Sequence, residues 1–224
     1  METNPQICDG ILYLTPAGGR TNANHAVPEP PSGVCGGLAC PPSQLVHDAG
    51  TYQLRYFPAA PYAKTTVQGL PFQQAKQVLY KRLYDYFNGD NTKNMTMPLT
   101  NPLILRLDPG SDGLWSNDNQ TLFFFISPEV ESPPDPTDTT IRVLEVNDYY
   151  LYIRTFPGNP VTYAEWMAEM LQLAADLDAD GVAYVKSYFY FATYTHPSRQ
   201  WDRVNEVQLL RPKSNSHDLE DTAL

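Results

Sequence analysis

The sequence is poor in the residues on which many catalytic and metal-binding sites depend. It contains three cysteines and four histidines among its 224 residues. The cysteines are Cys8, Cys35 and Cys40, so the chain beyond residue 40 has no thiol to serve as a nucleophile or as a metal ligand. This shortage argues against a cysteine-dependent enzyme.

Basic residues and long apolar runs are also scarce. The 25 Asp and Glu residues outnumber the 15 Lys and Arg residues, which gives a formal net charge of -10. This charge repels nucleic-acid phosphates and anionic membrane surfaces, so we expect neither as a partner. The longest apolar stretches, such as 122–126, fall far short of the roughly 20 residues of a membrane-spanning helix. The first ten residues lack the features of a secretory signal, which favours a cytoplasmic location.

Glycosylation sequons leave a secreted location open, and two cysteines lie close together in the sequence. Cys35 and Cys40 are spaced for a disulfide or for half of a metal site. Without a second Cys/His pair at ligand spacing, we interpret them as ordinary loop cysteines. Glycosylation sequons begin at Asn94 and Asn119, and these matter only in a secreted protein.

Composition divides the chain into an arm, a domain and a tail. Residues 1–49 are rich in proline and glycine and show no hydrophobic period, which predicts a poorly ordered arm or one draped on the domain. Residues 213–224 are mostly polar and charged and are typical of a tail. Between them, residues 50–212 carry the periodic patterns of one folded domain without an interrupting linker.

Strands and helices are predicted in the same order in two successive halves of this domain. The first half has extended stretches on both sides of an amphipathic helix over residues 72–87. The second half has them on both sides of a helix that begins with a capping box formed by Thr162 and Glu165. The predicted strands cover residues 52–56, 62–67, 99–107 and 121–127, then 140–146, 150–156, 182–195 and 205–210. The pattern indicates an internally duplicated α+β fold.

Side chains that could carry a reaction are few in the predicted domain. We recognise no serine or cysteine triad and no glycine-rich phosphate loop, so we expect no enzymatic activity. His196 lies in a loop, where a single imidazole is usually solvated. Aromatic residues are abundant instead, with 15 Tyr, 9 Phe and 3 Trp. They serve mainly the core, but their excess also fits the wall of a site for a flat apolar ligand.

Four segments carry a family resemblance, in matching order and spacing. They are Tyr52-Gln-Leu-Arg55, Gly89-Asp-Asn91 followed by Met95-x-Met97-x-x-Thr100-x-Pro102, Phe125-Ile-Ser-Pro-Glu129 with Pro133-Pro-x-Pro136, and Asn205-Glu-Val-x-Leu209. On these segments the chain resembles the SOUL haem-binding proteins from about Cys40 to Pro212. The resemblance implies a distorted antiparallel β-barrel that is flanked by two helices and built from two pseudo-symmetric halves.

The resemblance also implies a ligand and its place. Members of the family bind haem and related tetrapyrroles reversibly, largely by apolar contact, in a shallow groove beside the first helix. We therefore expect non-catalytic tetrapyrrole binding, for transport, buffering or sensing. The residues expected at the groove are Val78, Tyr80, Leu83 and Phe87 of the helix and Met95 and Met97 of the following loop, with Arg82 or Lys81 available for the propionates.

One departure from the family concerns the iron of the haem. In one branch of the family, a histidine proposed as the axial ligand follows the Tyr-x-x-Arg strand, and this chain has Tyr56 at that place. Histidine ligation at this position is therefore excluded. A tyrosine phenolate can ligate ferric haem, so Tyr56 is a candidate axial ligand as well as an ordinary strand aromatic. His196 is a second candidate.

The second helix suggests an alternative function. The same branch carries there a segment likened to the BH3 helices of cell-death regulators, whose counterpart here runs from Leu173 to Gly181. Asp178 stands where that branch is basic. The alternative is a protein-interaction module acting through this helix, although Leu173 and Leu177 also fit the core contacts of an ordinary amphipathic helix.

Overall fold

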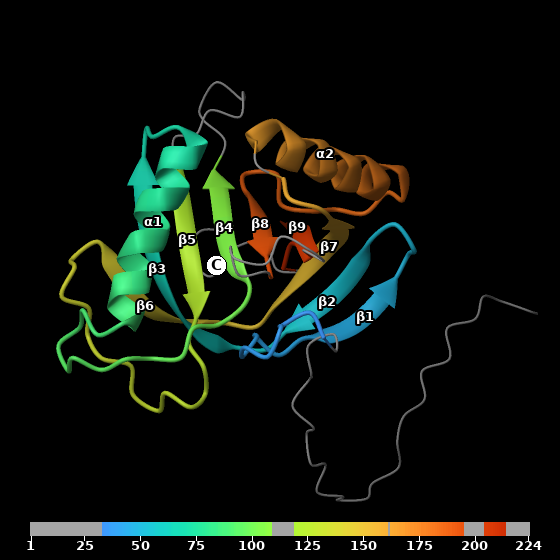
Figure 1. Ribbon diagram of the computed structural model, residues 1–224. Helices are drawn as coiled ribbons and strands as arrows, with labels where there is room; N and C mark the ends of the chain where they lie inside the picture. Colours follow the sequence, from blue (N-terminus) through green and yellow to red (C-terminus); the bar gives the residue numbers. More distant parts are fainter. Residues whose placement is uncertain (1–32, 109–118, 161, 195–203, 214–224) are drawn as a thin grey trace, which may run out of the picture.

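The computed structural model describes residues 33–108, 119–160, 162–194 and 204–213 (Figure 1). They form β1 (Gln44–Asp48), β2 (Gln53–Phe57), β3 (Ala60–Gln68), α1 (Phe72–Phe87), β4 (Leu103–Asp108), β5 (Asn119–Phe125), β6 (Ile141–Val146), β7 (Tyr149–Pro157), α2 (Tyr163–Ala179), β8 (Phe189–Thr193) and β9 (Val204–Leu210). The first 32 residues of the predicted arm, the tail from residue 214 and His196 lie outside the described residues. Neither described helix is long and apolar enough to cross a membrane.

Both helices lie where the sequence predicts them. α1 begins after Pro71, whose missing N–H is not needed at a helix start, and it is followed by Asn88 and by Gly89, which has a φ of 108°. At the start of α2, the Thr162 hydroxyl accepts from the Glu165 N–H at 3.3 Å, and the Glu165 carboxylate accepts from the Thr162 N–H at 2.7 Å. The predicted capping box is therefore confirmed.

The strands differ from the prediction in three places. β1 falls within residues 1–49, which the sequence assigned to an arm, so the sheet begins earlier than expected. The strand predicted over residues 99–107 starts only at β4, because Pro98 and Pro102 have no N–H for a neighbouring strand. The strand predicted over residues 182–195 is reduced to β8 among the described residues, and Val182 still belongs to the end of α2, where its N–H donates to the Leu177 carbonyl at 2.9 Å.

All nine strands of the described residues belong to one antiparallel sheet, in the order β1-β2-β7-β9-β8-β4-β5-β3-β6. We call β2, β3, α1, β4 and β5 half one, and β6, β7, α2, β8 and β9 half two. The first strand of each half lies beside the second strand of the other half, β2 beside β7 and β6 beside β3. The corresponding strands of the two halves are β2 and β6, β3 and β7, β4 and β8, and β5 and β9. Apart from β1, reading the order backwards and replacing each strand by its counterpart gives the same order again. The predicted duplication is therefore confirmed, and each half is completed by a strand of the other.

The sheet is strongly curled. The hydroxyls of Tyr62 on β3 and Tyr149 on β7 lie 3.2 Å apart and share a hydrogen bond. These strands are five positions apart in the sheet order, which would separate them by about 24 Å in a flat sheet. The curl remains open between the edge strands β1 and β6. The structure thus confirms an α+β fold with a distorted antiparallel barrel and two helices.

The two faces of the sheet have separate cores. α1 packs on β3 and β5, and α2 packs on β7 and β9, so both helices cover the outer face (Figure 1). Because neighbouring residues of a strand point to opposite faces, Phe124 lies beneath the helices while Phe123 and Phe125 point into the curl. The inner cluster is rich in aromatic side chains, namely Phe57, Tyr62, Phe123, Phe125, Tyr149, Tyr190 and Tyr194.

Candidate functional site

The inside of the curl is too full to receive a ligand. Tyr62, Phe123 and Tyr190 are at most 1% exposed and fill the space between the strands. A cavity beside Tyr149 and Tyr194 has a volume of only about 10 Å³. That is about the smallest space that holds a single water molecule. The described residues inside the curl therefore leave no space for a larger molecule.

A disulfide between Cys35 and Cys40 closes a short loop against this inner cluster. The interpretation of these residues as unpaired loop cysteines is therefore wrong. A turn, closed by a 3.1 Å hydrogen bond from the Leu38 N–H to the Cys35 carbonyl, brings the two residues together. The Asn101 side chain then donates to the carbonyls of Cys35 at 3.1 Å and Tyr194 at 2.7 Å, which fixes the loop on the sheet.

One buried ion pair also lies inside the curl. Arg55 on β2 donates to Glu206 on β9 at 3.0 Å, with side chains 9% and 2% exposed. The Glu206 carboxylate also accepts from Tyr194 at 3.0 Å and from Gln208 at 2.8 Å. Burial raises the pKa of Tyr194 well above its ordinary value, and the neighbouring Glu206 raises it further. Since each charge has partners within the sheet, this network is a structural one.

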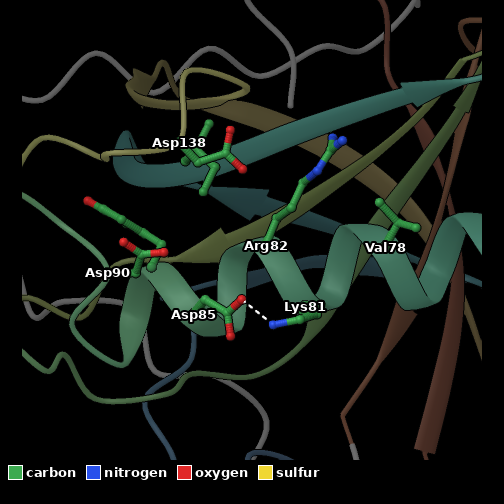
Figure 2. A pocket seen from close by; sticks show the side chains of 8 residues that line it. Val78, Lys81, Arg82, Asp85, Asp90 and Asp138 are labelled. Atoms are coloured by element: carbon green, nitrogen blue, oxygen red, sulfur yellow. Dashed lines mark hydrogen bonds and ion pairs between the residues drawn. The ribbon is translucent and has the colours of Figure 1, made fainter.

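A groove of about 290 Å³ lies outside the sheet, between α1 and the start of β6 (Figure 2). The buried side chains of Tyr86 and Ile141 form its floor, and Val78, which is 36% exposed, forms part of its wall. The other lining residues are charged, namely Lys81, Arg82, Asp85, Asp90 and Asp138. The groove therefore combines an apolar floor with charged groups at its rim.

The two cations of the groove come from neighbouring positions of α1. Lys81 donates to Asp85, four residues later, at 2.6 Å, and this hydrogen bond raises the pKa of Lys81. Arg82 turns instead toward the sheet, where one terminal nitrogen donates to the Thr65 hydroxyl at 3.4 Å and to the Thr66 carbonyl at 3.3 Å. A guanidinium has five N–H donors, so Arg82 retains capacity to bind an anionic group.

Two carboxylates of the groove are fixed by threonines. The Thr137 hydroxyl donates to Asp90 at 2.6 Å. Thr140 donates to Asp138 twice, from its N–H at 2.8 Å and from its hydroxyl at 2.7 Å. These bonds from Thr140, together with the charge of Arg82, lower the pKa of Asp138. Asp138 is therefore ionised at neutral pH.

The predicted groove residues divide into three groups in the structure. Val78 and Arg82 line the groove. Tyr80 points to the opposite flank of α1, where its ring stacks on Tyr84 at 5.5 Å and contacts Phe124 of β5. The remaining residues lie largely in the core, with Leu83, Phe87 and Met97 at most 2% exposed and Met95 partly buried. Contact of these last residues with a ligand stays a prediction.

Sequence reasoning missed the part of the groove that half two contributes. Asp138 and Ile141 come more than fifty positions after Arg82 and reach α1 only because β6 pairs with β3. No local sequence pattern predicts that β6 pairs with a strand of the other half. The repeated order of elements predicted two similar halves, but it did not predict which strands of one half pair with strands of the other.

The candidate iron ligands are not brought to this groove among the described residues. Tyr56 lies on β2, where its ring contacts Tyr150 of β7 at 5.0 Å. It points to the same face as Leu54, which packs in the outer core. In the sheet order β2 lies six positions from β3, so Tyr56 belongs to the side covered by α2. His196 lies outside the described residues, and its role as a ligand stays a prediction.

The apolar stripe of α2 is turned inward. Leu173 and Leu177 have no exposed surface, and Met170 is 2% exposed. Leu171, at 51%, is the large apolar side chain that this helix exposes. A partner that used the buried leucines would have to detach the helix from β7 and β9. This arrangement does not support the protein-interaction alternative, which stays a prediction.

Solved structures contain the same fold. The chain is similar to the crystal structure of the EcmrR C-terminal domain, with a TM-score of 0.54 and 10% sequence identity, over 72% of this chain and 97% of that one. The EcmrR chain in a cryo-EM structure of an EcmrR–DNA complex gives a TM-score of 0.52 at the same identity, over 72% of this chain and 59% of that one. At such low identity the likeness concerns the fold alone.

Relatives with greater sequence identity are haem-binding proteins by name. The chain is 29% identical to heme-binding protein 2 of Mus musculus over 199 residues, which cover 84% of this chain and 96% of that protein. It is 27% identical to heme-binding protein 1 of Xenopus laevis over 164 residues, covering 73% of this chain and 85% of that one. A model of the SOUL heme-binding protein family matches residues 38–210. Because this match spans most of the sequence, the chain belongs to the SOUL heme-binding protein family.

Proposed function

We propose that this protein binds haem or a related tetrapyrrole reversibly, without catalysing a reaction, in the groove between α1 and β6. The observation that carries the proposal is the combination, along one helix, of an apolar wall at Val78 with a cation at Arg82. The relatives named heme-binding protein 1 and 2 support the ligand class. The filled interior of the curl supports the outer position of the site.

The groove fits a tetrapyrrole that is only partly covered. Its volume of about 290 Å³ lies just below the roughly 300–1,000 Å³ of typical small-molecule pockets. One edge of the macrocycle would lie on Val78 and Ile141, while the rest faces solvent. Arg82 would bind a carboxylate of the ligand by a charge-assisted hydrogen bond. When bound, haem would supply the iron and the strong visible absorbance by which binding can be followed.

Such a site is suited to exchange of the ligand. A ligand covered on one edge gains less apolar contact than an enclosed one and dissociates more readily. The proposal does not depend on Tyr56, which lies on the α2 side of the sheet. Transport, buffering and sensing all require this kind of reversible binding, and we propose one of them as the cellular role.

The test is to fill the groove and to compare a matched change on the other helix. Val78→Trp places a bulky ring in the groove, and Leu171→Trp makes the same kind of change at an exposed leucine of α2. Both positions are exposed, at 36% and 51%, so both variants should fold. Hemin titration followed by Soret absorbance should show at least tenfold weaker binding for Val78→Trp, and unchanged binding for Leu171→Trp. Equal affinities for the two variants would place the site elsewhere.

A further inference from the structure

The groove carries an unequal distribution of charge. Asp85, Asp90 and Asp138 contribute three carboxylates to its lining, whereas Lys81 and Arg82 contribute two cations. Figure 2 shows the three carboxylates near the end of the groove where α1 stops, and Val78 farther back along the helix. One end of the groove is therefore acidic and the other apolar.

The end of α1 supplies no cation to balance these carboxylates, because its last turn has no basic residue. The carbonyls of this turn are already bonded, as those of Tyr84 and Asp85 accept from the N–H groups of Asn88 and Asp90 at 3.0 Å. The acidic character of this end of the groove therefore comes from the carboxylates, of which Asp85 lies in the last turn and Asp90 follows closely.

The cations do not offset these carboxylates equally. Lys81 is engaged by Asp85 at 2.6 Å, so a ligand carboxylate would have to compete with a carboxylate already in place. Arg82 points to the sheet and uses one terminal nitrogen in its two long contacts, to Thr65 and Thr66. The groove thus provides one cation, Arg82, that can receive an acidic group of the ligand.

We infer that the groove selects tetrapyrroles that carry a single carboxylate over those that carry two or four. This inference rests on the proposed function and specifies the ligand class for the same site. One carboxylate can pair with Arg82, whereas each further carboxylate on the covered edge meets Asp90 or Asp138. A charge held some 8 Å from another like charge, near a protein surface, weakens binding by roughly threefold to thirtyfold.

The experiment compares iron-free ligands that differ in carboxylate number. Fluorescence titrations of the full chain with protoporphyrin monomethyl ester, protoporphyrin and coproporphyrin cover one, two and four carboxylates. Affinity should fall by at least threefold at each step at low ionic strength, and the differences should shrink at about 1 M salt, where the Debye length is about 3 Å. Equal affinities, or affinities that rise with carboxylate number, would overturn the inference and leave the proposed function standing. If none of the three ligands bound, the proposed function would fail as well.

A matched pair of variants tests the residues. Asp90→Asn removes one negative charge from the groove, and Asp148→Asn removes one from the exposed turn between β6 and β7. The ratio of the affinities for the monocarboxylate and the dicarboxylate should fall by at least threefold in Asp90→Asn and stay unchanged in Asp148→Asn. An equal change in both variants would mean that the overall charge of -10, rather than the groove, sets the preference.

Discussion

Half one leaves a groove between its helix and the sheet, whereas half two fills the corresponding space. In half two, Tyr52 donates from its hydroxyl to Asp180 at the end of α2 at 2.8 Å. Arg154 rises from β7 and donates to Glu169 of α2 at 2.8 Å, and it lies 3.6 Å from Asp176. These contacts tie the second helix to the strands beneath it, and they occupy the space that corresponds to the groove.

The difference comes in part from one pair of corresponding positions. Arg154 is the sixth residue of the nine-residue strand β7, and Thr65 is the sixth residue of the nine-residue strand β3. Half one thus has a short threonine where half two has an arginine that reaches its helix. In the sheet, Thr65 pairs with Ile141, which lines the groove. Duplication of one architecture therefore gives one closed unit and one open unit through side-chain size.

The largest expected effect comes from separating the halves. Fragments 1–136 and 137–224 should each fail to fold alone, because β2 lacks β7 in the first fragment and β6 lacks β3 in the second. Mixing the two fragments should restore the native circular dichroism spectrum and a cooperative thermal transition. A cooperative transition in either isolated fragment would show that strand exchange is not required for its stability.

The second effect concerns the arginine that closes half two. Arg154→Thr gives β7 the residue that β3 has at this position, and it leaves Glu169 and Asp176 without their cation. We expect the free energy of unfolding to fall by about 2 kcal/mol, less than for a fully buried pair because the three side chains are partly exposed. The control is Lys186→Gln, which removes an exposed pair with Asp178 at 3.8 Å and should cost about 0.5 kcal/mol or less. Equal losses in urea unfolding would contradict the closing role of Arg154.

The third effect concerns the tyrosine of the same closed space. Tyr52→Phe removes the hydrogen bond to Asp180 and should lower the free energy of unfolding by about 1 kcal/mol at neutral pH. Burial, and then this hydrogen bond, raises the pKa of Tyr52 to about 12 from 10.0. Because the folded pKa is the higher one, this stabilisation is complete below pH 10 and is lost as the pH rises to 12. The difference between wild type and variant should therefore shrink over this interval. A difference in the free energy of unfolding that stayed constant up to pH 12 would argue against a raised pKa of Tyr52.

The smallest effect concerns the open half. Asp138→Asn removes a carboxylate whose pKa is lowered below 3.8 by the bonds from Thr140. Asp138 lies three residues before β6, and the residue three before β2, the corresponding strand, is Gly50. A carboxyl group whose pKa is lowered in the folded state stabilises the fold at pH values above its ordinary pKa. This stabilisation is lost as the pH falls through the lowered pKa. We expect a loss of less than about 1 kcal/mol at pH 7, since the residue is partly exposed. Thermal unfolding of wild type and variant should begin to converge only as the pH falls below 3.8, the ordinary pKa of the group. A difference that stayed constant well below this pH would have another cause.

The sequence was informative wherever structure depends on near neighbours. The spacing of apolar residues predicted α1, and the pair Thr162 and Glu165 predicted the start of α2, because both depend on contacts within a few residues. The repeated order of elements predicted two halves. β1 was missed because its five residues are all exposed and show no alternation of apolar and polar side chains.

The groove was predicted only in part, because its second wall comes from a distant strand. Val78 and Arg82 follow from the helix pattern and the family resemblance, and they line the groove. Tyr56 was a candidate because it stands where one branch of the family has a proposed axial histidine, yet its strand pairs with β7 on the side covered by α2. Pairing between strands about a hundred residues apart depends on the whole sheet and leaves no local pattern.

Strand exchange also fixes when this protein can fold during its synthesis. Gln53 pairs with Ile153, so β2 meets its neighbour only after about a hundred further residues have been added. At roughly 5–20 residues per second, translation takes about 5–20 s to supply them. Contacts so distant in the chain also slow folding after release, because a long loop must close first. The nascent first half therefore has a period of many seconds in which β2 lacks β7 and chaperones can bind its unpaired strand.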